Sequence, residues 1–454
     1  MSDLLIIGSG PGGYRAAYHA ATHGLSVVIV EESKAGGTCL NSGCIPTKSL
    51  CRDAEIIETL RNAERFGASG VTYSVDFAKI VARKDDVVSR LRSGVESLLA
   101  RDGITFVHGH AVLVDSHSVV VEGRRYEAKN VIIATGSRPT LPPIAGIGLP
   151  GVMTSDALLE LRYVPEELCI VGAGVVGMEM ASAFCSFGSK VTVVEYAKEV
   201  LPSMDGDIAK RLRQALGRRG VTIQTQCAVA SIAEESCGDT ARTKLCVTYE
   251  RRGRTAQTRA DVVLIATGRK PNVEELGIES LGIESDCRGI TTDDDYQTTA
   301  PGVYAIGDVN GRQMLAHAAT AQGLHVVNHI LGAPCGIRHD VLPAAVFTIP
   351  EAASVGMSDD EACARGIEHT CRKGFFRSNG KAVAMGDTDG MIKIVVDARD
   401  RIIGCHAFGP HAADIVQETA SLMSLNATMR QLAGAIHIHP TLGETAWETA
   451  LAAL

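Results

Sequence analysis

The sequence predicts an α/β protein in which one strand–helix–strand module occurs twice and a separate α+β domain follows. Three observations lead to this prediction. Residues 4–31 and 168–195 each read as an apolar strand, a G-x-G-x-x-G turn, a helix and a second strand. Residues 131–136 and 262–268 are apolar runs that both end in Ala-Thr-Gly. From about Pro343 the glycine turns give way to alternating strands and an amphipathic helix.

Each glycine turn has the spacing and context of a dinucleotide-binding site. The first glycine permits a tight turn, the second lets backbone amides approach a pyrophosphate, and the third lets helix and strand pack closely. The helix N-terminus offers N–H groups to phosphate, and an acidic residue 18 positions after the third glycine can accept from a ribose. Glycine turns without a ligand are common, but two complete copies favour two Rossmann-like domains. The residues are Gly8, Gly10, Gly13 and Glu31 in the first copy and Gly172, Gly174, Gly177 and Glu195 in the second.

Composition excludes several classes of protein. With 45% hydrophobic and 21% charged residues, the 454-residue chain has the composition of a folded globular protein. The net charge of −8 comes without a long basic run, so we expect no nucleic-acid partner. We also expect no membrane association and a cytoplasmic location, because the sequence shows no membrane-length apolar run and no basic leader. Apart from Cys39 and Cys44, the 13 cysteines are scattered singly, Cys237 among them, and we interpret them as reduced structural thiols.

The segment GGTCLNSGCIPTK at residues 36–48 carries the strongest chemical signal. Cys39 and Cys44 are five positions apart and can close a disulfide across a helical turn or a turn-like loop. Half a zinc site and two buried thiols are the alternatives, but zinc needs about four ligands and no second Cys/His pair of ordinary spacing is nearby. The glycines and Pro46 favour a shaped loop against a flat ligand. The segment therefore predicts a redox-active disulfide and no metal site.

The segment HIHPTLGE at residues 437–444 is the second reactive motif. Taken alone, His-x-His with a nearby glutamate fits a metal site or a satisfied polar turn. We expect His437 to be structural.

Taken together, the motifs resemble the FAD-dependent pyridine nucleotide–disulfide oxidoreductases, and within that family they are closest to the dihydrolipoamide dehydrogenases. The resemblance covers essentially the whole chain. It rests on GSGPGG at 8–13, GGTCLNSGCIPTK at 36–48, ATGSRP at 134–139, GAGVVGME at 172–179, ATGRKPN at 266–272, YAIGDV at 304–309 and HIHPTLGE at 437–444. The cysteine and histidine motifs are highly specific, whereas the glycine motifs alone are not.

The resemblance implies two Rossmann-like domains, one for FAD and one for NAD, and a C-terminal α+β dimerisation domain. We expect the first part of the FAD-binding domain at residues 1–148, the NAD-binding domain at 149–271, the returning FAD or central segment at 272–342 and the interface domain at 343–454.

The resemblance also implies which residues bind the cofactors. For FAD they are Gly8, Gly10, Gly13, Glu31, Thr38, Lys48, Ala111, Thr135, Gly136, Ser137, Asp308, Met314, Leu315, Ala316 and His317. For NAD they are Gly172, Gly174, Gly177, Glu195 and Gly268. A carboxylate at Glu195 accepts from a free 2′-OH and repels a 2′-phosphate, so NAD is favoured over NADP. Lys48 would pair with Glu179 near the flavin, and a structural salt bridge is the alternative for that pair.

By the same resemblance, the reaction is the oxidation of dihydrolipoyl groups by NAD⁺. His439 would act as general acid/base, Glu444 would fix its tautomer, and the substrate thiol would attack Cys39 and release Cys44 toward the flavin. The alternatives are another NAD(P)H-dependent FAD disulfide reductase of the family and a non-catalytic flavoprotein scaffold. The intact set of reactive groups argues against a scaffold. Phe347 stands where many lipoamide dehydrogenases carry Tyr, so the match to that substrate class is slightly weaker at this position.

The partners follow from the same family. We expect a homodimer in which the partner's His439 completes each active site. The apolar face formed by Ile415, Val416, Leu422 and Met423 is a candidate for the subunit contact, with an internal core face as the alternative. No lipoyl domain precedes the first module, so we expect the lipoyl arm to come from another chain. That chain would be a lipoylated carrier protein or an E2 component. It would belong to a 2-oxoacid dehydrogenase complex or to the glycine cleavage system.

Overall fold

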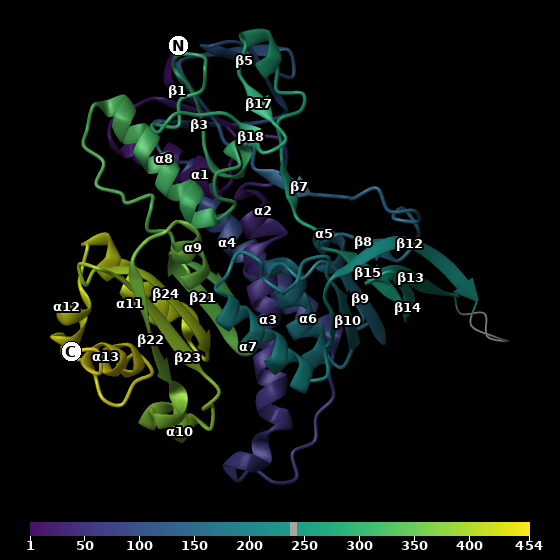
Figure 1. The fold of residues 1–454 in the computed structure, drawn as a ribbon. Helices are drawn as coiled ribbons and strands as arrows, with labels where there is room; N and C mark the ends of the chain where they lie inside the picture. Colours follow the sequence, from purple (N-terminus) through teal and green to yellow (C-terminus); the bar gives the residue numbers. More distant parts are fainter. Residues whose placement is uncertain (237–242) are drawn as a thin grey trace. The chain divides into compact units, whose positions relative to one another are not determined.

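The computed structural model describes residues 1–236 and 243–454, which fold as two compact units (Figure 1). Unit 1 contains Met1–Ser49, Ala78–Thr140 and Gly268–His339, and unit 2 contains Leu50–Phe77, Leu141–Thr267 and Asp340–Leu454. Cys237 lies outside the described residues, so the structural role predicted for it stays a prediction.

Throughout 1–236 and 243–454, none of the helices combines the length and the apolar character needed to cross a membrane.

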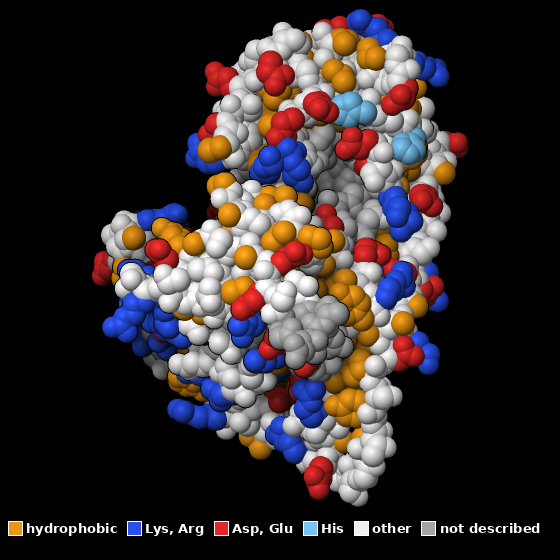
Figure 2. Space-filling model, turned by 90° about the vertical axis from the view of Figure 1, so that its right-hand side faces the viewer, with side chains coloured by type: hydrophobic (Ala, Val, Ile, Leu, Met, Phe, Trp, Pro, Cys, Tyr) orange, Lys and Arg blue, Asp and Glu red, His pale blue; other side chains and the backbone are white. Residues whose placement is uncertain are grey.

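On the face shown in Figure 2, acidic and basic side chains are interspersed, as the composition leads us to expect.

A seven-stranded sheet forms the centre of unit 1. Its strands are β1 (Ser2–Ile7), β2 (Val27–Glu31), β3 (Ile104–His108), β4 (Ala111–Asp115), β5 (Ser118–Val121), β6 (Arg124–Ile133) and β19 (Val303–Ala305). Strands β3, β2, β1, β6 and β19 are parallel neighbours in that order. The first half of β6 continues instead into an antiparallel meander with β5 and β4. The parallel part agrees with the strand–helix–strand pattern of the sequence.

The two faces of this sheet have different covers. The helices of the unit are α1 (Pro11–Thr22), α2 (Gly37–Asn41), the start of α3 (Cys44–Arg61), most of α4 (Phe77–Leu99) and α8 (Ala316–Leu331). Because side chains alternate along a strand, Leu4 and Ile6 of β1 pack with residues of α1, α4 and α8. Leu5 and Ile7 pack on the opposite face with β4, β5 and the returning segment after residue 268.

Short strands complete the unit: β7 (Ser137–Pro139) with β16 (Arg269–Pro271), and β17 (Ser285–Asp286) with β18 (Gly289–Ile290).

Unit 2 contains the second module and two antiparallel sheets. Its parallel sheet has the order β11 (Thr222–Gln224), β10 (Lys190–Val194), β9 (Glu167–Val171), β15 (Val262–Ile265) and β8 (Val152–Met153). Beside it lie α5 (Ser155–Leu158), α6 (Val175–Phe187), α7 (Gly206–Arg218) and the three-stranded sheet β12 (Cys227–Ser236), β13 (Thr243–Arg251) and β14 (Arg254–Ala260). The repeated strand–helix–strand arrangement around α6 confirms the predicted duplication.

The C-terminal part of unit 2 is the predicted α+β region. Its antiparallel sheet has the order β20 (Ala344–Val346), β21 (Glu351–Gly356), β24 (Ile402–Gly409), β23 (Met391–Asp397) and β22 (His369–Phe375). The helices are α9 (Asp359–Ala364), α10 (Gly380–Met385), α11 (Ala412–Ser424), α12 (Met429–Ala433) and α13 (Glu444–Leu451).

One expectation about this region is wrong. On α11, Ile415, Val416 and Met423 are buried in the core of the C-terminal sheet, and Leu422 packs against that core. The apolar face of α11 therefore serves its own domain and is not available as a subunit contact. Helical periodicity reveals an apolar face but not which surface covers it.

A buried lysine joins the second module to the C-terminal sheet. The ammonium of Lys393 on β23 lies 2.9 Å from Asp205, 3.0 Å from Asp207 and 3.1 Å from Asp359. The Lys393 side chain is 3% exposed and that of Asp205 is fully buried. Burial lowers the pKa of Lys393, but the hydrogen bonds from Asp205 and Asp207 outweigh it and hold the pKa above its ordinary value. Lys393 therefore stays charged and is stabilised only while its carboxylates surround it.

Replacing this lysine should destabilise unit 2 strongly. Lys393→Met leaves Asp205 buried without its cation, so we expect the free energy of unfolding to fall by about 3–5 kcal/mol. Urea unfolding followed by the fluorescence of Trp447, the single tryptophan of the chain, measures this change. Lys373→Met is the matched control: Lys373 also pairs with Asp207, at 2.8 Å, but is 41% exposed. Its loss should cost less than about 1 kcal/mol. Equal effects of the two substitutions would show that the buried cluster contributes no special stability.

Candidate functional site

The first glycine turn is fixed by backbone crowding and by one carboxylate. Gly8 has a φ of +100°, and a Cβ there would collide with the carbonyl of Ala134. A Cβ on Gly13 would collide with the carbonyl of Gly8, so only glycine allows α1 to approach β1 this closely. The buried carboxylate of Glu31, at the end of β2, accepts from the backbone N–H of Ser9 at 2.8 Å and from its hydroxyl at 2.7 Å. Glu31 thus locks the turn to the neighbouring strand.

The second glycine turn repeats this arrangement. Gly172 has a φ of +106° beside the carbonyl of Ala266, and a Cβ on Gly177 would collide with the carbonyl of Gly172. Glu195 follows β10, and its carboxylate accepts from the N–H of Ala173 at 2.5 Å and from the N–H of Ala197 at 2.6 Å. The sequence repeat therefore corresponds to a repeat of structure down to individual hydrogen bonds.

Both turns have the donors and the space that a dinucleotide needs. Gly10 and Gly174 hold the capping positions of α1 and α6, and as glycines they carry no side chain that could accept from the first helical turn. Those N–H groups and the positive end of the helix suit a pyrophosphate. A Cβ placed on Gly10 or Gly136 in unit 1, or on Gly174 in unit 2, would meet no neighbouring side chain or distant backbone atom within 4 Å. Gly268, predicted for NAD, belongs to unit 1, so its role toward NAD stays a prediction. The residues present therefore fit the phosphate and ribose groups of FAD in unit 1 and NAD in unit 2.

Polar contacts hold some of the other residues predicted for FAD in unit 1. Ser137 donates to the carboxylate of Asp308 at 2.6 Å, although the two are far apart in sequence. Thr135 donates to the carbonyl of Asn272 at 2.7 Å, and the Asn272 amide donates back to the carbonyl of Thr135 at 2.9 Å. Met314 and Leu315 directly precede α8, and Ala316 and His317 begin it. Ala111 lies buried at the start of β4.

Sequence analysis missed three residues that hold this network. Arg269 donates from Nε to the hydroxyl of Ser137 at 2.7 Å. Buried Gln322 on α8 accepts from the N–H of Gly307 at 2.7 Å and from the Asn310 amide at 2.9 Å, which fixes the turn that bears Asp308. Arg269 and Asn272 lie inside the ATGRKPN motif, so closer attention to its polar members would have found them. Gln322 has no motif to mark it.

The cysteine pair lies at a break between two helices. Cys39 is in α2 and Cys44 is the first residue of α3, with Thr38 beside Cys39 and Lys48 one turn after Cys44. The shaped loop expected for this segment is therefore wrong: Ser42 and Gly43 form only a short interruption between helices. A Cβ on Gly43 would come within 2.9 Å of the carbonyl of Thr38, which explains the glycine at this point.

The two sulfurs are close enough to interact directly. Both are thiols in this structure, and a hydrogen bond with Cys44 is the largest of the effects that raise the pKa of Cys39. Burial raises this pKa further, whereas the positive charge of Lys48 acts in the opposite direction. A thiol pair that shares a proton in this way is suited to a change between dithiol and disulfide.

The α2 helix is held by residues that sequence analysis did not single out. The Asn41 amide donates to the carbonyls of Ala35 and Gly37, both at 3.0 Å. Arg92 on α4 donates to the Asn41 side-chain oxygen at 2.9 Å. These bonds position α2, and with it Cys39, within unit 1.

His439 and Glu444 form a directed pair at the start of α13. Nδ1 of His439 lies 2.9 Å from the Glu444 carboxylate, whose other oxygen accepts from the N–H of Thr441 at 2.7 Å. The Thr441 and His439 hydrogen bonds hold the pKa of Glu444 below its ordinary value. An ionised carboxylate only accepts, so Nδ1 carries the proton and Nε2 is left as the acceptor. The His439 side chain is 80% exposed, which presents Nε2 outward.

His437 has contacts of a different kind. Its ring lies 2.8 Å from the Glu418 carboxylate and stacks on Trp447, and its side chain is 8% exposed. These contacts agree with the structural role expected for it.

Glu179 anchors the start of the C-terminal domain to α6. It is 3% exposed, and its carboxylate accepts from the backbone N–H of Phe347 at 2.9 Å. Any residue except proline at position 347 supplies this N–H, so the contact does not depend on whether Phe or Tyr stands there. Lys48 belongs to unit 1 and Glu179 to unit 2, and their pairing stays a prediction.

Comparisons with known proteins agree on one family. The family model described as pyridine nucleotide-disulphide oxidoreductase matches residues 2–323, and the model of its dimerisation domain matches residues 342–450. The dihydrolipoyl dehydrogenase of Geobacillus stearothermophilus is 39% identical over 100% of this chain and 96% of its own length. The mitochondrial dihydrolipoyl dehydrogenase 1 of Arabidopsis thaliana is 35% identical over 99% and 90%.

A solved structure extends the likeness to three dimensions. The HOCl-induced flavoprotein disulfide reductase RclA of Escherichia coli superimposes with a TM-score of 0.87 at 30% identity, covering 99% of both chains. Since the family model spans most of the chain and the relatives match it from end to end, this chain belongs to the pyridine nucleotide-disulphide oxidoreductase family.

Proposed function

We propose that this chain oxidises protein-bound dihydrolipoyl groups with NAD⁺, through a Cys39–Cys44 redox pair and FAD. The observation that carries the proposal is the interacting thiol pair at the α2–α3 break, in the unit that bears the first glycine turn. The full-length likeness to several dihydrolipoyl dehydrogenases supports the choice of substrate.

FAD and NAD(H) are the cofactors of the family, and the residues that would hold them follow the two modules. In our assignment, residues 1–148 and 272–342 bind FAD through Glu31, Lys48 and Asp308, while residues 149–271 bind NAD through Glu195. Residues 343–454 form the interface domain. FAD bound by these residues would supply the two-electron redox chemistry that links the thiol pair to NAD⁺.

The chain's own groups supply the acid–base and thiol chemistry. Nε2 of His439 takes a proton from the substrate thiol, and Glu444 stabilises the resulting imidazolium. The substrate thiolate attacks the Cys39 sulfur of the disulfide, and Cys44 leaves as a thiolate. The second substrate thiol then displaces Cys39, which yields the lipoyl disulfide and the reduced pair. The positive charge of Lys48 opposes the rise in the Cys39 pKa, so it favours thiolate at this place.

We propose that the active unit is a homodimer in which the partner's His439 serves each thiol pair. The His439 ring is exposed, and so are two apolar side chains just before it in the chain: Ile436 is fully exposed and Ile438 is 80% exposed. Exposed apolar side chains in a row indicate a surface that another chain covers. The match of residues 342–450 to a dimerisation domain supports a second copy as that chain.

We further propose that the substrate is a lipoyl arm on another protein. The protein that presents it would be a lipoylated carrier protein or an E2 component. It would belong to a 2-oxoacid dehydrogenase complex or to the glycine cleavage system. The described cysteines are thiols, which fits the reducing conditions of the cytoplasm. Assays of NAD⁺ reduction with isolated reduced carrier proteins test the substrate directly. Turnover with a small disulfide and none with any lipoylated carrier would favour another disulfide reductase of the family.

Substitution of either redox cysteine should separate flavin reduction from disulfide exchange. We expect Cys39→Ser and Cys44→Ser to retain FAD, to lose lipoamide reduction, and to keep NADH oxidation by an artificial electron acceptor. Each variant lacks one of the two sulfurs that the exchange needs, whereas hydride transfer to the flavin needs neither. Steady-state assays with lipoamide and with the acceptor measure both activities. Cys287→Ser, an exposed cysteine of the same unit, is the control and should keep both. Lipoamide turnover in either redox variant would show that the pair is structural.

The position of Glu195 should select the nicotinamide cofactor. We expect kcat/KM for NADH to exceed that for NADPH by at least ~100-fold, because a 2′-phosphate would meet the Glu195 carboxylate. Glu195→Gln removes the negative charge and should narrow this ratio. Glu31→Gln, at the matching position of the other module, should weaken FAD retention and leave the ratio unchanged when FAD is supplied. Equal kcat/KM values for the two cofactors in the wild-type protein would contradict the assignment.

Mixing inactive chains should test the shared active site. Cys44→Ser and His439→Gln are each expected to be inactive with lipoamide. In a mixed dimer, one of the two sites would combine an intact thiol pair with an intact histidine. Random pairing should therefore restore about a quarter of wild-type sites, measured as lipoamide activity after subunit exchange. Cys39→Ser mixed with Cys44→Ser is the control, since both defects lie in the thiol pair and no site recovers. Mixed dimers without activity would show that His439 acts within its own chain.

A further inference from the structure

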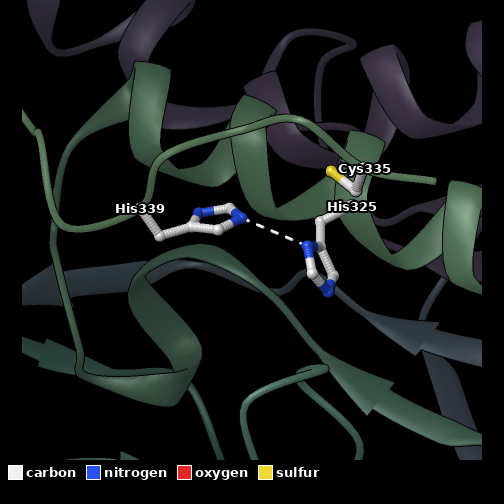
Figure 3. A group of neighbouring side chains, drawn as sticks. All are labelled: His325, Cys335 and His339. Carbon is white, nitrogen blue, oxygen red and sulfur yellow. Dashed lines mark hydrogen bonds between the residues drawn. The ribbon is translucent and has the colours of Figure 1, made fainter. Parts of the chain in front are cut away.

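Two histidines and a cysteine meet in unit 1, away from the residues assigned to catalysis. His325 lies on α8, while Cys335 and His339 lie in the segment that follows this helix. Nδ1 of His325 is 3.3 Å from Nε2 of His339, and the Cys335 sulfur lies within 4.8 Å of a ring nitrogen of each histidine. Figure 3 shows the three side chains converging from the helix and from the segment after it.

We propose that His325, Cys335 and His339 bind a zinc ion, with water as the fourth ligand. Two imidazole nitrogens and one thiolate form a donor set that zinc favours. With Zn–N distances of about 2.0–2.1 Å, two nitrogens on a tetrahedral ion lie about 3.3–3.4 Å apart. The two histidine nitrogens already have this separation. The Cys335 sulfur would need to approach to about 3.6 Å of each nitrogen, given a Zn–S distance of about 2.3 Å. That approach is a movement of about 1 Å, within reach of a side-chain rotation.

The surroundings of His325 are those of a metal ligand. Its second nitrogen, Nε2, lies 2.9 Å from a carboxylate oxygen of Asp295. An ionised carboxylate only accepts, so Nε2 carries the proton and Nδ1 offers its lone pair toward His339. A carboxylate that orients a histidine through its other nitrogen recurs around protein-bound metals, and it fixes the tautomer that binds. Asp295 therefore acts as a positioning residue for the proposed site.

A buried tyrosine fixes both imidazoles. Tyr296 is 4% exposed, and its ring meets His325 edge-on at 5.5 Å and His339 at 5.4 Å between ring centroids. The ring limits rotation of both histidines and gives the site an apolar wall. Such a wall lowers the local dielectric and strengthens bonds to a cation.

Proton balance at the site is simple. Without a metal, Nε2–H of His339 donates to Nδ1 of His325, so a proton occupies the place between the two nitrogens. When zinc binds, the ring hydrogen of His339 moves from Nε2 to Nδ1, and the ion takes the place between the two nitrogens. Each ring then still carries one hydrogen, so both rings stay neutral. The Cys335 thiol releases one proton to water and binds as thiolate. No oxidant or reductant is needed.

A second group of similar residues is less suited to a metal. Asp359, Cys363 and His369 also have ligand atoms within 4.8 Å of one another in unit 2. The ammonium of Lys393 lies 3.1 Å from the Asp359 carboxylate, so this carboxylate already has a cation as its partner. Cys363 therefore provides a control for thiol-dependent binding elsewhere in the chain.

Metal binding by the full-length, FAD-loaded protein tests the proposal without reference to its activity. The protein is stripped with a chelator, kept oxidised so that Cys39 and Cys44 are paired, and titrated with ZnCl₂ against a chromophoric chelator. We expect one zinc ion per chain. Cys335→Ser and His339→Ala should each abolish this binding, and Asp295→Asn should weaken it about 10–100-fold. Cobalt(II) in place of zinc should give the visible bands of a thiolate-bound ion, absent in Cys335→Ser.

Controls separate this site from the rest of the chain. His329→Ala removes a histidine one turn further along α8 and 3.5 Å from Asp295, and Cys363→Ser removes the thiol of the other group. Both variants should bind zinc as the wild type does. Flavin absorbance shows whether each variant is folded. Absence of a stoichiometric zinc ion in the wild type overturns the proposal, as does binding that survives Cys335→Ser or that Cys363→Ser removes.

Discussion

The structure depends on one hydrogen bond that both modules contain. In each module a glutamate at the end of the second strand accepts from a backbone N–H of the glycine turn that follows the first strand. Glu31 holds Ser9 in unit 1, and Glu195 holds Ala173 in unit 2. The helix after the turn must leave its first N–H groups free for phosphate, so a capping side chain at that helix cannot be what stabilises the turn. A carboxylate from the neighbouring strand orders the turn without covering those N–H groups. In our assignment the same carboxylate would also accept from the ribose of the dinucleotide.

Sequence patterns predicted the parts of the fold that local physics decides. Residues 4–31 were predicted to form one strand–helix–strand module, and in the structure its second strand does end at Glu31, where the apolar run gives way to polar residues. The glycine turns were predictable because backbone crowding at Gly8 and Gly13 admits no other residue. The cysteine segment was misjudged, since glycines suggest a loop while the contacts of Asn41 and Arg92 stabilise a helix instead. The Arg92 contact comes from α4, 51 positions away in the chain, and no local pattern around the cysteines indicates it.

Long-range contacts explain the other features that the sequence did not reveal. Lys393 appears in an apolar strand as an isolated charge, and nothing near it in sequence indicates three carboxylates from α7 and α9. The apolar face of α11 was visible, but its cover was not, because a helix face packs equally well on its own sheet or on a second chain. His325, Cys335 and His339 belong to no metal-binding motif, and the sequence does not show that they meet in space. Their own spacing, with a cysteine four positions before the last histidine, was the available signal.

The two modules differ in what their chains build after the second strand. After Glu31 the chain enters α2 and α3 and places a thiol pair close to its own nucleotide turn. After Glu195 it reaches Asp205, which caps α7 through the N–H of Asp207 and binds Lys393 of the C-terminal sheet. One module therefore leads into redox chemistry, whereas the other is joined firmly to the domain that carries His439. That join fixes the start of α7 to the C-terminal sheet, while the His439 side chain stays exposed and is oriented by Glu444. A rigid domain that presents one oriented, exposed histidine beside exposed isoleucines is suited to completing a site on another chain.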